Sequence, residues 1–500
     1  MLKAVKSTKD IEILSEARKL EILCSKDSLE IKGTVYYVSN SGNDSNDGKT
    51  PETAWQTLNK VSSAPLMPGD GVKFKRGDLF RGYVATKSGV TYCAYGNGDK
   101  PKFYGWDKSL ADESLWEIYD QKHNIWKLKE LILDCGTLVF NDGEAHCRKL
   151  IPSYLDGHFV CRDEPTKSFD VSTEMTEDLD LYCHFESKLT TADYGGRQGF
   201  PVPEMNDTAL TELYLRCDKG NPATVFDSIE ALPHRSMFCI HGTKNVTIDN
   251  LCLKYIGVHA VAAATTSGLH VSNCEIGWIG GVVQNYYGHE PNFPEGGRGT
   301  VTRFGNGVEI YGGCDDYVVK NCYIYQCYDC AMTHQISTNG KFFELKNVRY
   351  TENLVEHCVY SIEYFLYKNN RPDDSYCENC EFDNNISRLC GYGWGQQRHN
   401  KDTPAHIKSW NAENTLTKNF SIHDNIFDRS AYRMIHIVAE NEKSCPKMYN
   451  NTYVQNRGAL LGQFGSKENG IPEMLYYDDS VEQTIKEIIK DENATVIFCD

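Results

Sequence analysis

Five short segments carry the residues of this chain that are best suited to chemistry. They are Gly307–Tyr311, Ala331–Gln335, Ser361–Phe365, Tyr392–Gln396 and Met434–Val438. We interpret them as strands, on which successive side chains point to opposite faces. Apolar residues alternate inward, and the positions between them form one predicted outward column. This column reads Glu309, Thr333, Glu363, Trp394 and His436.

Two glutamates in one column indicate acid–base catalysis. Stacked strands lie about 4.8 Å apart, so Glu309 and Glu363, with Thr333 between them, are expected roughly 9–10 Å apart. Inverting glycosidases hold their carboxyl groups about 6.5–9.5 Å apart and retaining ones about 5–5.5 Å apart, so the spacing favours inversion. We assign Glu363 as the acid, because aromatic neighbours would raise its pKa, and Glu309 as the base. Those neighbours are Tyr360, Tyr364 and Phe365.

Polar and aromatic residues near the column are candidates for binding a sugar, because sugar faces stack on rings while their hydroxyls need hydrogen-bond partners. His334 is expected between the two glutamates, in contact with substrate or with a carboxylate. The alternative is an ordinary solvated strand face. The predicted substrate-binding residues are Tyr311, Gln335, Tyr364, Trp394, Arg398, His406, Lys408, Trp410 and His436.

Aspartates that follow two of the strands are further catalytic candidates. Asp315 and Asp316 follow a Gly-Gly pair, and Asp329 lies at the equivalent position one repeat later. Carboxylates gathered there would form a catalytic pair or a calcium site. Alternatively they cap backbone N–H groups of turns. We predict no required cofactor, although Ca²⁺ binding is possible, and no other metal.

A repeated asparagine marks the elements that must position these residues. It recurs at intervals of 23 to 48 residues, and periods of 20–50 residues are typical of repeat architectures. Because the repeat unit is β-rich, we predict stacked coils, with the asparagines hydrogen-bonded along a buried turn. The positions are Asn250, Asn273, Asn321, Asn353, Asn385, Asn425 and Asn451.

The N-terminal region resembles the opening of right-handed parallel β-helix proteins of the pectate-lyase-like superfold. This resemblance implies an all-β, right-handed parallel β-helix solenoid whose N-terminal helix, beginning near Thr50-Pro51, caps the open end. It covers residues 34–105 and 235–460. The superfold includes lyases, hydrolases, epimerases and non-enzymatic adhesins, so the reaction stays open. The matching residues are Tyr36–Asp44, Asp47-Gly48, Pro51, Trp55, Leu58, Pro68–Asp70, Phe74 and Gly77-Asp78.

We divide the chain into five parts. Residues 1–33 are a charged lead-in with a helix over Lys9–Leu23, and residues 34–105 form the N-terminal cap and first coils. Residues 106–234 are a β-rich insertion beside the early coils, part of which could cover a cleft. Residues 235–470 form the main β-helix with the catalytic face, and its Gly/Pro-rich loop 285–303 is a candidate binding loop. Residues 471–500 form a helical C-terminal cap.

Composition limits the partners. The net charge of −17 disfavours nucleic acid, which requires a basic surface, and repels polyuronates. No stretch approaches the ~18 apolar residues of a membrane span, and no apolar signal segment follows Met1. The chain as written is therefore expected in the cytoplasm, or outside the cell if a leader has been removed. Its twenty cysteines are expected as stacked, reduced core residues rather than as disulfides or a zinc site.

These features predict a carbohydrate-active enzyme, a glycoside hydrolase (EC 3.2.1.-) that acts as a monomer or homodimer. The first alternative is a polysaccharide lyase (EC 4.2.2.-) or uronate epimerase. For these the resemblance implies a Lys or Arg base, such as Lys408 or Arg398, and His334 or His436 would serve in a variant. The second alternative is a non-catalytic carbohydrate-binding solenoid.

Overall fold

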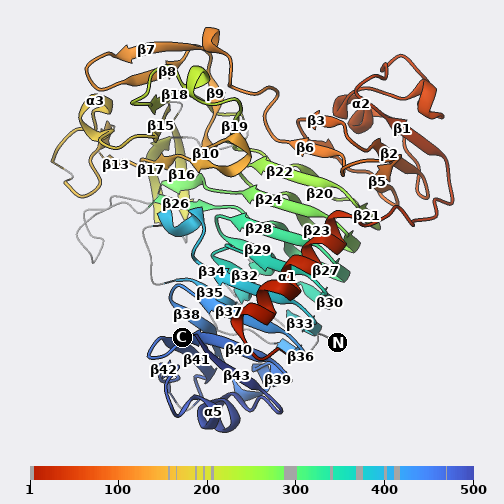
Figure 1. The fold of residues 1–500 in the computed structure, drawn as a ribbon, viewed down its shortest axis with the longest axis vertical. Helices are drawn as coiled ribbons and strands as arrows, with labels where there is room; N and C mark the ends of the chain where they lie inside the picture. Colours follow the sequence, from red (N-terminus) through yellow and green to blue (C-terminus); the bar gives the residue numbers. More distant parts are fainter. Residues whose placement is uncertain are drawn as a thin grey trace.

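Most elements described in the protein are β-strands (Figure 1). Two sheets, of eighteen and ten strands, contain most of them, and their strands pair in parallel apart from one terminal pair in the larger sheet. The predicted all-β class with parallel sheets is confirmed. The computed structural model describes residues 5–499 apart from 156–157, 165, 186–188, 195–196, 204–207, 287–300, 338–341, 368–374, 399–402, 410–416 and 469.

The chain passes repeatedly from one sheet to the other, so each pass through both makes one coil. The smaller sheet contains β3 (Leu79–Arg81), β6 (Lys102–Tyr104), β22 (Cys252–Ile256), β24 (Glu275–Ile279), β28 (Tyr323–Cys327), β31 (Leu354–Glu356), β34 (Ile386–Cys390), β37 (Ile426–Ser430), β40 (Thr452–Asn456) and β43 (Thr495–Cys499). The larger sheet contains β1 (Val35–Val38), β2 (Gly71–Lys75), β4 (Val84–Ala85), β5 (Thr91–Tyr95), β20 (Phe238–His241), β21 (Val246–Asp249), β23 (Val261–Ser272), β27 (Val308–Lys320), β29 (Cys330–Ser337), β30 (Glu344–Thr351), β32 (Tyr360–Tyr367), β33 (Tyr376–Asp383), β35 (Ala405–Ser409), β36 (Thr417–His423), β38 (Arg433–Ala439), β39 (Lys447–Tyr449), β41 (Leu460–Ser466) and β42 (Leu475–Tyr476).

Between β6 and β20 the chain leaves these two sheets and builds smaller, mainly antiparallel ones around a separate buried cluster that includes Trp116, Leu138 and Leu213. A short hairpin, β25 (Val282–Tyr286) with β26 (Val301–Phe304), lies between two later coils. The elements of the excursion are β7 (Trp116–Asp120), β8 (Ile125–Leu128), β9 (Ile132–Leu133), β10 (Cys135–Phe140), β11 (Ala145–His146), β12 (Arg148–Lys149), β13 (Ser153–Leu155), β14 (His158–Val160), α3 (Val171–Glu174), β15 (Asp180–Phe185), β16 (Leu189–Tyr194), β17 (Arg197–Pro203), β18 (Leu210–Arg216), α4 (Pro222–Val225) and β19 (Ile229–Pro233).

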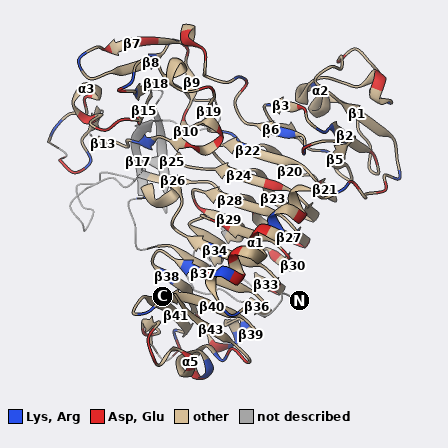
Figure 2. Ribbon diagram, in the orientation of Figure 1, with Lys and Arg blue, Asp and Glu red and all other residues tan. Residues whose placement is uncertain are grey.

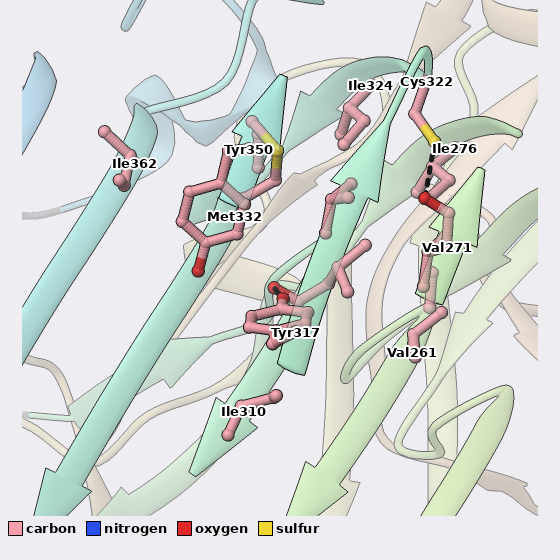
Figure 3. Packing of buried hydrophobic residues seen from close by; sticks show 14 of the residues in the cluster. Val261, Val271, Ile276, Ile310, Tyr317, Cys322, Ile324, Met332, Tyr350 and Ile362 are labelled. Carbon is pink, nitrogen blue, oxygen red and sulfur yellow. Dashed lines mark hydrogen bonds between the residues drawn. The ribbon is translucent and has the colours of Figure 1, made fainter. Parts of the chain in front are cut away.

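The interior of the coils is filled by residues at matching positions of successive strands. Val308 pairs with Met332 and Met332 with Ile362, and all three are fully buried. Figure 3 shows Met332 and Ile362 in this packing. Several cysteines join this packing, and all twenty are free thiols. The Cys322 thiol, for example, is buried and lies 3.7 Å from the Val271 carbonyl oxygen (Figure 3). This placement agrees with the predicted stacked thiols.

The repeated asparagines belong to two neighbouring columns, not one. Asn250, Asn273 and Asn321 have positive φ at the turn between the sheets. In the next coil that turn position is Glu352, so the sequence-based alignment of Asn353 with Asn321 is wrong by one residue. The turn column continues with Asn384, Asp424 and Asn450, whereas the second column contains Asn353, Asn385, Asn425 and Asn451.

The second column is a buried hydrogen-bond ladder. The Asn385 side-chain amide donates to the Tyr350 carbonyl at 2.9 Å and to the Asn425 Oδ1 at 3.1 Å. Its own Oδ1 accepts from the backbone N–H and the side-chain amide of Asn353. Asn353, Asn425 and Asn451 repeat this pattern, and the Asp491 carboxylate ends the ladder. Buried amides are thereby satisfied, as stable folding requires.

Helices near the two ends of the chain also lie outside the strand repeat. Helix α1 (Thr8–Leu23), predicted over Lys9–Leu23, packs Ile11 and Ile22 against residues of the smaller sheet (Figure 1). The Thr50–Thr53 capping box begins the short helix η1 (Pro51–Thr53), as predicted. Helix α2 (Leu58–Ser63), helix α5 (Val481–Thr484) and the π-turn η6 (Ile485–Ile489) add apolar side chains to the main core. The hand of the coil and the role of these helices as end caps stay predictions.

Positive and negative residues are mixed along the described part of the ribbon, and Lys and Arg do not gather in one large region (Figure 2). One row of paired strand positions reads Asp315, Lys346, Glu378 and Lys418, with the two end residues exposed and the two middle ones half-buried. Within the described part of the chain, none of the helices has the length and hydropathy needed to cross a membrane.

We expect Asn385→Ala to lower the free energy of unfolding by about 1–3 kcal/mol, because it leaves buried partners of the amide unsatisfied. Asn379→Gly is the control, since Asn379 belongs to an exposed chain of asparagines and glycine tolerates its positive φ of 55°. The measurement is the midpoint of urea unfolding followed by circular dichroism. Equal midpoints for the two variants would contradict a stabilising role for the buried ladder.

Candidate active site

The strand register places two glutamates and a lysine in one column. Glu309 pairs with Thr333, Thr333 with Glu363, and Glu363 with Lys408. Lys408 in turn pairs with His436. The predicted column is therefore confirmed at Glu309, Thr333, Glu363 and His436.

Trp394 is not part of the column, and the prediction that placed it there is wrong. The chain after β34 forms a short 3-10 helix, η4 (Trp394–Gln397), before it returns to the larger sheet at β35. Trp394 is buried in a small aromatic cluster, and its indole N–H donates to the Gln326 carbonyl at 2.7 Å. Lys408 occupies the column position that was predicted for Trp394.

Glu309 is held by two neutral groups. The Asn306 side-chain amide donates to Oε2 of Glu309, and Nε2 of His259 lies 3.3 Å from the same oxygen. The Asn306 backbone N–H donates to His259 Nδ1 at 3.0 Å, so neutral His259 carries its proton on Nε2, facing Glu309. Burial, and then the charge of Asp329, raise the pKa of Glu309 to about 7, against the hydrogen bond from Asn306. Burial lowers the pKa of His259 to about 4.

Glu363 has a donor at each carboxylate oxygen. The Lys408 ammonium lies 3.5 Å from Oε1, and the Gln335 amide donates to Oε2 at 3.0 Å. Burial raises the pKa of Glu363 to about 7, although Lys408 opposes this shift. Burial lowers the pKa of Lys408, but the Tyr360 hydroxyl, 2.8 Å away, and Glu363 outweigh it and leave that pKa raised.

Asp329 lies at the start of β29, in the coil between the two glutamates. Its carbonyl accepts from the Tyr360 N–H at 3.0 Å, and its carboxylate accepts from the Arg398 guanidinium at 2.6 Å. The negative charge of Asp329 raises the pKa of both Glu309 and Glu363, so it lies close enough to act on each. The structure therefore brings three carboxylates together on three successive coils.

Three predicted residues point into the interior. His334 pairs with Tyr364 across neighbouring strands, and their rings stack with centroids 5.7 Å apart. His334 Nδ1 lies 3.0 Å from the Tyr350 hydroxyl, and burial lowers the His334 pKa to about 3. His406 is also buried, 2.7 Å from the Ser387 hydroxyl. The expected place of His334 between the glutamates is wrong, because strand alternation turns it to the opposite face from Thr333.

The other predicted residues lie at different distances from the column. Tyr311 pairs with Gln335 beside the column and is 42% exposed. Asp315 and Asp316 lie on the part of β27 that pairs with β30, where they bond Asn347 and His270 respectively. They are therefore not part of the carboxylate cluster. Trp410 and residues 287–300 of the Gly/Pro-rich loop lie outside the described residues.

Sequence reasoning missed two residues that support the cluster: His259 and Asn306. Each acts through the fold, because His259 and Asn306 meet only where two coils stack. Asn306 stands between two glycines just before β27, and a polar residue flanked by glycines is the one local signal available. Calcium binding stays a prediction; no group of three or more His, Cys, Asp or Glu side chains arranged to hold a metal ion occurs among the described residues.

A large cleft lies beside this cluster. It has a volume of about 1120 Å³, and the excursion between β6 and β20 contributes one wall while η4 and β28 contribute the other. Arg398 lines this cleft as well as a neighbouring cavity of about 220 Å³. Arg398 also binds Asp329, so one residue of the cleft wall contacts the carboxylate cluster, although none of the three carboxylates lines the cleft itself.

Comparison with known proteins finds similarity only among solved structures. No family model and no curated protein matches the chain. The GH136 lacto-N-biosidase from Eubacterium ramulus is 13% identical, with 98% of this chain and 70% of that one covered and a TM-score of 0.34. A protein named as a glycoside hydrolase is 10% identical, with 93% of this chain and 97% of that one covered and a TM-score of 0.43. The polygalacturonase from Erwinia carotovora ssp. carotovora is 8% identical, with 94% of this chain and 96% of that one covered and a TM-score of 0.33. All three matches are below 25% identity, so the likeness concerns the fold alone.

Proposed function

We propose that this chain is a glycoside hydrolase built on a right-handed parallel β-helix, with Glu309 and Glu363 as its catalytic pair. The observation that carries the proposal is their shared column, with one strand between them. This spacing of about 9–10 Å between backbones suits an inverting reaction, in which a water molecule enters between substrate and base. Both pKa values lie near 7, where a group can act as acid or base.

The contacts favour roles opposite to those expected from sequence. Both oxygens of Glu363 face donors, one of them charged, so its carboxylate form is favoured. The donors to Glu309 both bind Oε2, which leaves Oε1 to carry a proton. We therefore assign Glu309 as the acid that protonates the leaving oxygen while the C1–O bond breaks. Glu363 takes a proton from the water that attacks C1.

Lyase chemistry is less well supported, because it needs an unprotonated base near an acidic sugar. Lys408 is held as an ammonium between Glu363 and Tyr360, and Arg398 is paired with Asp329. Burial lowers the pKa of His436 to about 3, which makes it a weak base. Buried carboxylates at this density are also unusual for a surface that only binds.

We expect Glu309→Gln and Glu363→Gln each to reduce hydrolysis of an unactivated glycoside by about 10²–10⁴-fold. Only Glu309→Gln is expected to recover on a dinitrophenyl glycoside, because that leaving group needs no protonation. The assay measures reducing ends and near-ultraviolet absorbance over a panel of oligosaccharides. Recovery by Glu363→Gln alone would reverse the roles, full activity of both variants would reject the pair, and absorbance from a new double bond would indicate a lyase.

Asp329 is proposed to tune both glutamates rather than to react. Asp329→Asn removes a negative charge that raises their pKa values and leaves the Arg398 cation unpaired. Both limbs of the pH–rate profile are therefore expected to move to lower pH. An unchanged profile would exclude this role, and loss of activity at every pH would indicate that Asp329 itself reacts.

The buried carboxyl of Glu309 should also make stability depend on pH. Its folded pKa, about 7, lies above the ordinary 4.5, so stability is present below pH 4.5 and is lost as pH rises to about 7. We expect Glu309→Gln to remove this loss, on the order of 2–3 kcal/mol, and to raise the thermal midpoint at pH 8 but not at pH 4.5. Glu356→Gln is the control: this buried glutamate pairs with Arg388, so its loss should lower the midpoint. A lower midpoint for Glu309→Gln at pH 8 would contradict the assignment.

A further inference from the structure

The cleft of about 1120 Å³ is larger than the catalytic pair requires. Sites for one small ligand usually measure about 300–1,000 Å³, so this volume suits a chain of several sugar rings. Its accessible surface includes the exposed Tyr392 ring and the exposed Gln396 side chain on the coil side. Arg148 and the half-buried His146 face it from the excursion.

Specific bonds hold the two walls together. Within the excursion, the Lys149 ammonium is buried against the Asp134 carboxylate and donates to the Cys135 carbonyl at 2.7 Å, and Asp134 in turn accepts from the Val283 N–H of β25 at 2.9 Å. The Gln397 side chain, on η4, accepts from the Lys149 N–H at 3.1 Å and donates to the Cys147 carbonyl at 2.7 Å. These bonds tie the excursion to the coils, so the cleft is preorganised, which lowers the entropic cost of binding.

The charges that line the cleft are mostly neutralised within the protein. Arg148 pairs with Asp180, Lys167 with Glu174, and Arg398 with Asp329, in addition to the buried Lys149–Asp134 pair. Arg162 lies next to Asp163 and Glu164 in sequence, and both of these line the cleft. The groups left to bind a ligand are amides, an aromatic ring and paired guanidinium groups, which suit hydroxyl-rich neutral molecules better than polyanions.

Arg398 connects this cleft to the reacting groups. Its guanidinium binds Asp329 and lies over the Tyr360 ring, 5.7 Å from the centroid. The Lys408 ammonium lies 4.1 Å from the same centroid and 3.5 Å from Glu363. Tyr360 therefore contacts both a residue of the cleft wall and the cation that binds Glu363.

We propose that the cleft binds the sugar residues adjoining the cleaved bond, so that the substrate is a neutral oligosaccharide of at least three residues. The proposal rests on the function proposed above. Tyr392 supplies a stacking platform and Gln396 a hydrogen-bond partner for these residues. Both act on binding and neither on the chemical step.

The test measures binding by calorimetry to the Glu363→Gln variant, which is impaired in turnover. The probes are xylo-, cello-, malto- and β-galacto-oligosaccharides of one to five residues, with trigalacturonate as the acidic probe. We expect at least one neutral series to bind about tenfold or more tightly at three residues than at one. Adding Tyr392→Ala or Gln396→Ala should weaken the trisaccharide about 5–20-fold and leave the monosaccharide unchanged.

Tyr476→Ala is the matched control, because Tyr476 is an exposed tyrosine on β42 and is not part of the cleft wall. In otherwise unsubstituted enzyme, Tyr392→Ala should raise KM for the trisaccharide with little change in kcat. The proposal falls if no neutral series binds, if affinity does not grow with length, if trigalacturonate binds best, or if Tyr392→Ala behaves like Tyr476→Ala. Length-dependent binding without hydrolysis by the wild type would keep the cleft and reject the hydrolase. Hydrolysis that is unchanged by substitution of Tyr392 and Gln396 would keep the hydrolase and reject the cleft as the binding site.

Discussion

The register between neighbouring coils is the constraint on which the structure depends, and the buried asparagine ladder fixes it. Each ladder amide bonds a carbonyl in the preceding coil and a side chain further along the chain, which is the next asparagine or, for Asn451, the Asp491 carboxylate. A coil that slipped by one residue would lose these bonds inside the core, where no water replaces them. The same slip would exchange inward and outward side chains along every strand. The ladder therefore decides that Glu309 and Glu363 face outward while His334 faces inward.

The rigid register holds carboxyl groups in buried positions that lower the stability of the fold. The carboxyl groups of Glu309 and Glu363 are buried close to that of Asp329. Each has a partner at a defined oxygen: Asn306 for Glu309, Lys408 for Glu363 and Arg398 for Asp329. Such an arrangement lowers stability, yet it supplies carboxyl groups that titrate near neutral pH. A strand sheet whose spacing repeats at about 4.8 Å can place these groups without depending on flexible loops.

Much of the fold could be predicted from sequence because its signals are periodic. Alternation and repeat spacing were sufficient for the strands around Glu309, Thr333, Glu363 and His436. They failed at Trp394, where a 3-10 helix and a longer connection precede the strand that carries Lys408. They also failed by one residue at Asn353, because turn and core positions both use asparagine.

The support of the carboxylates could not be predicted in this way. His259 and Asn306 meet Glu309 only after coils stack, and local spacing does not encode a contact between different coils. His334 shows the complementary failure: a histidine next to two glutamates in the alignment attracts a chemical role, but its position in the alternation assigns it to the core. At this position the residue type predicted a role in the site, which is wrong, whereas the alternation of side chains along the strand correctly predicts a place in the core.

Helix α1 has a consequence for how the molecule unfolds. Stacked coils contact only their neighbours, so an array of them can open from one end. The α1 side chains share one buried cluster with Tyr323, Leu354, Ile386, Ile426 and Val454, which belong to five successive coils. Just beyond the helix, Asp27 binds Arg76 and Asn250 of the early coils. Opening of the last coils therefore removes contacts of α1, whose following segment is anchored at the first coils. This links the two ends of the stack, so the coils are expected to unfold together as one cooperative unit.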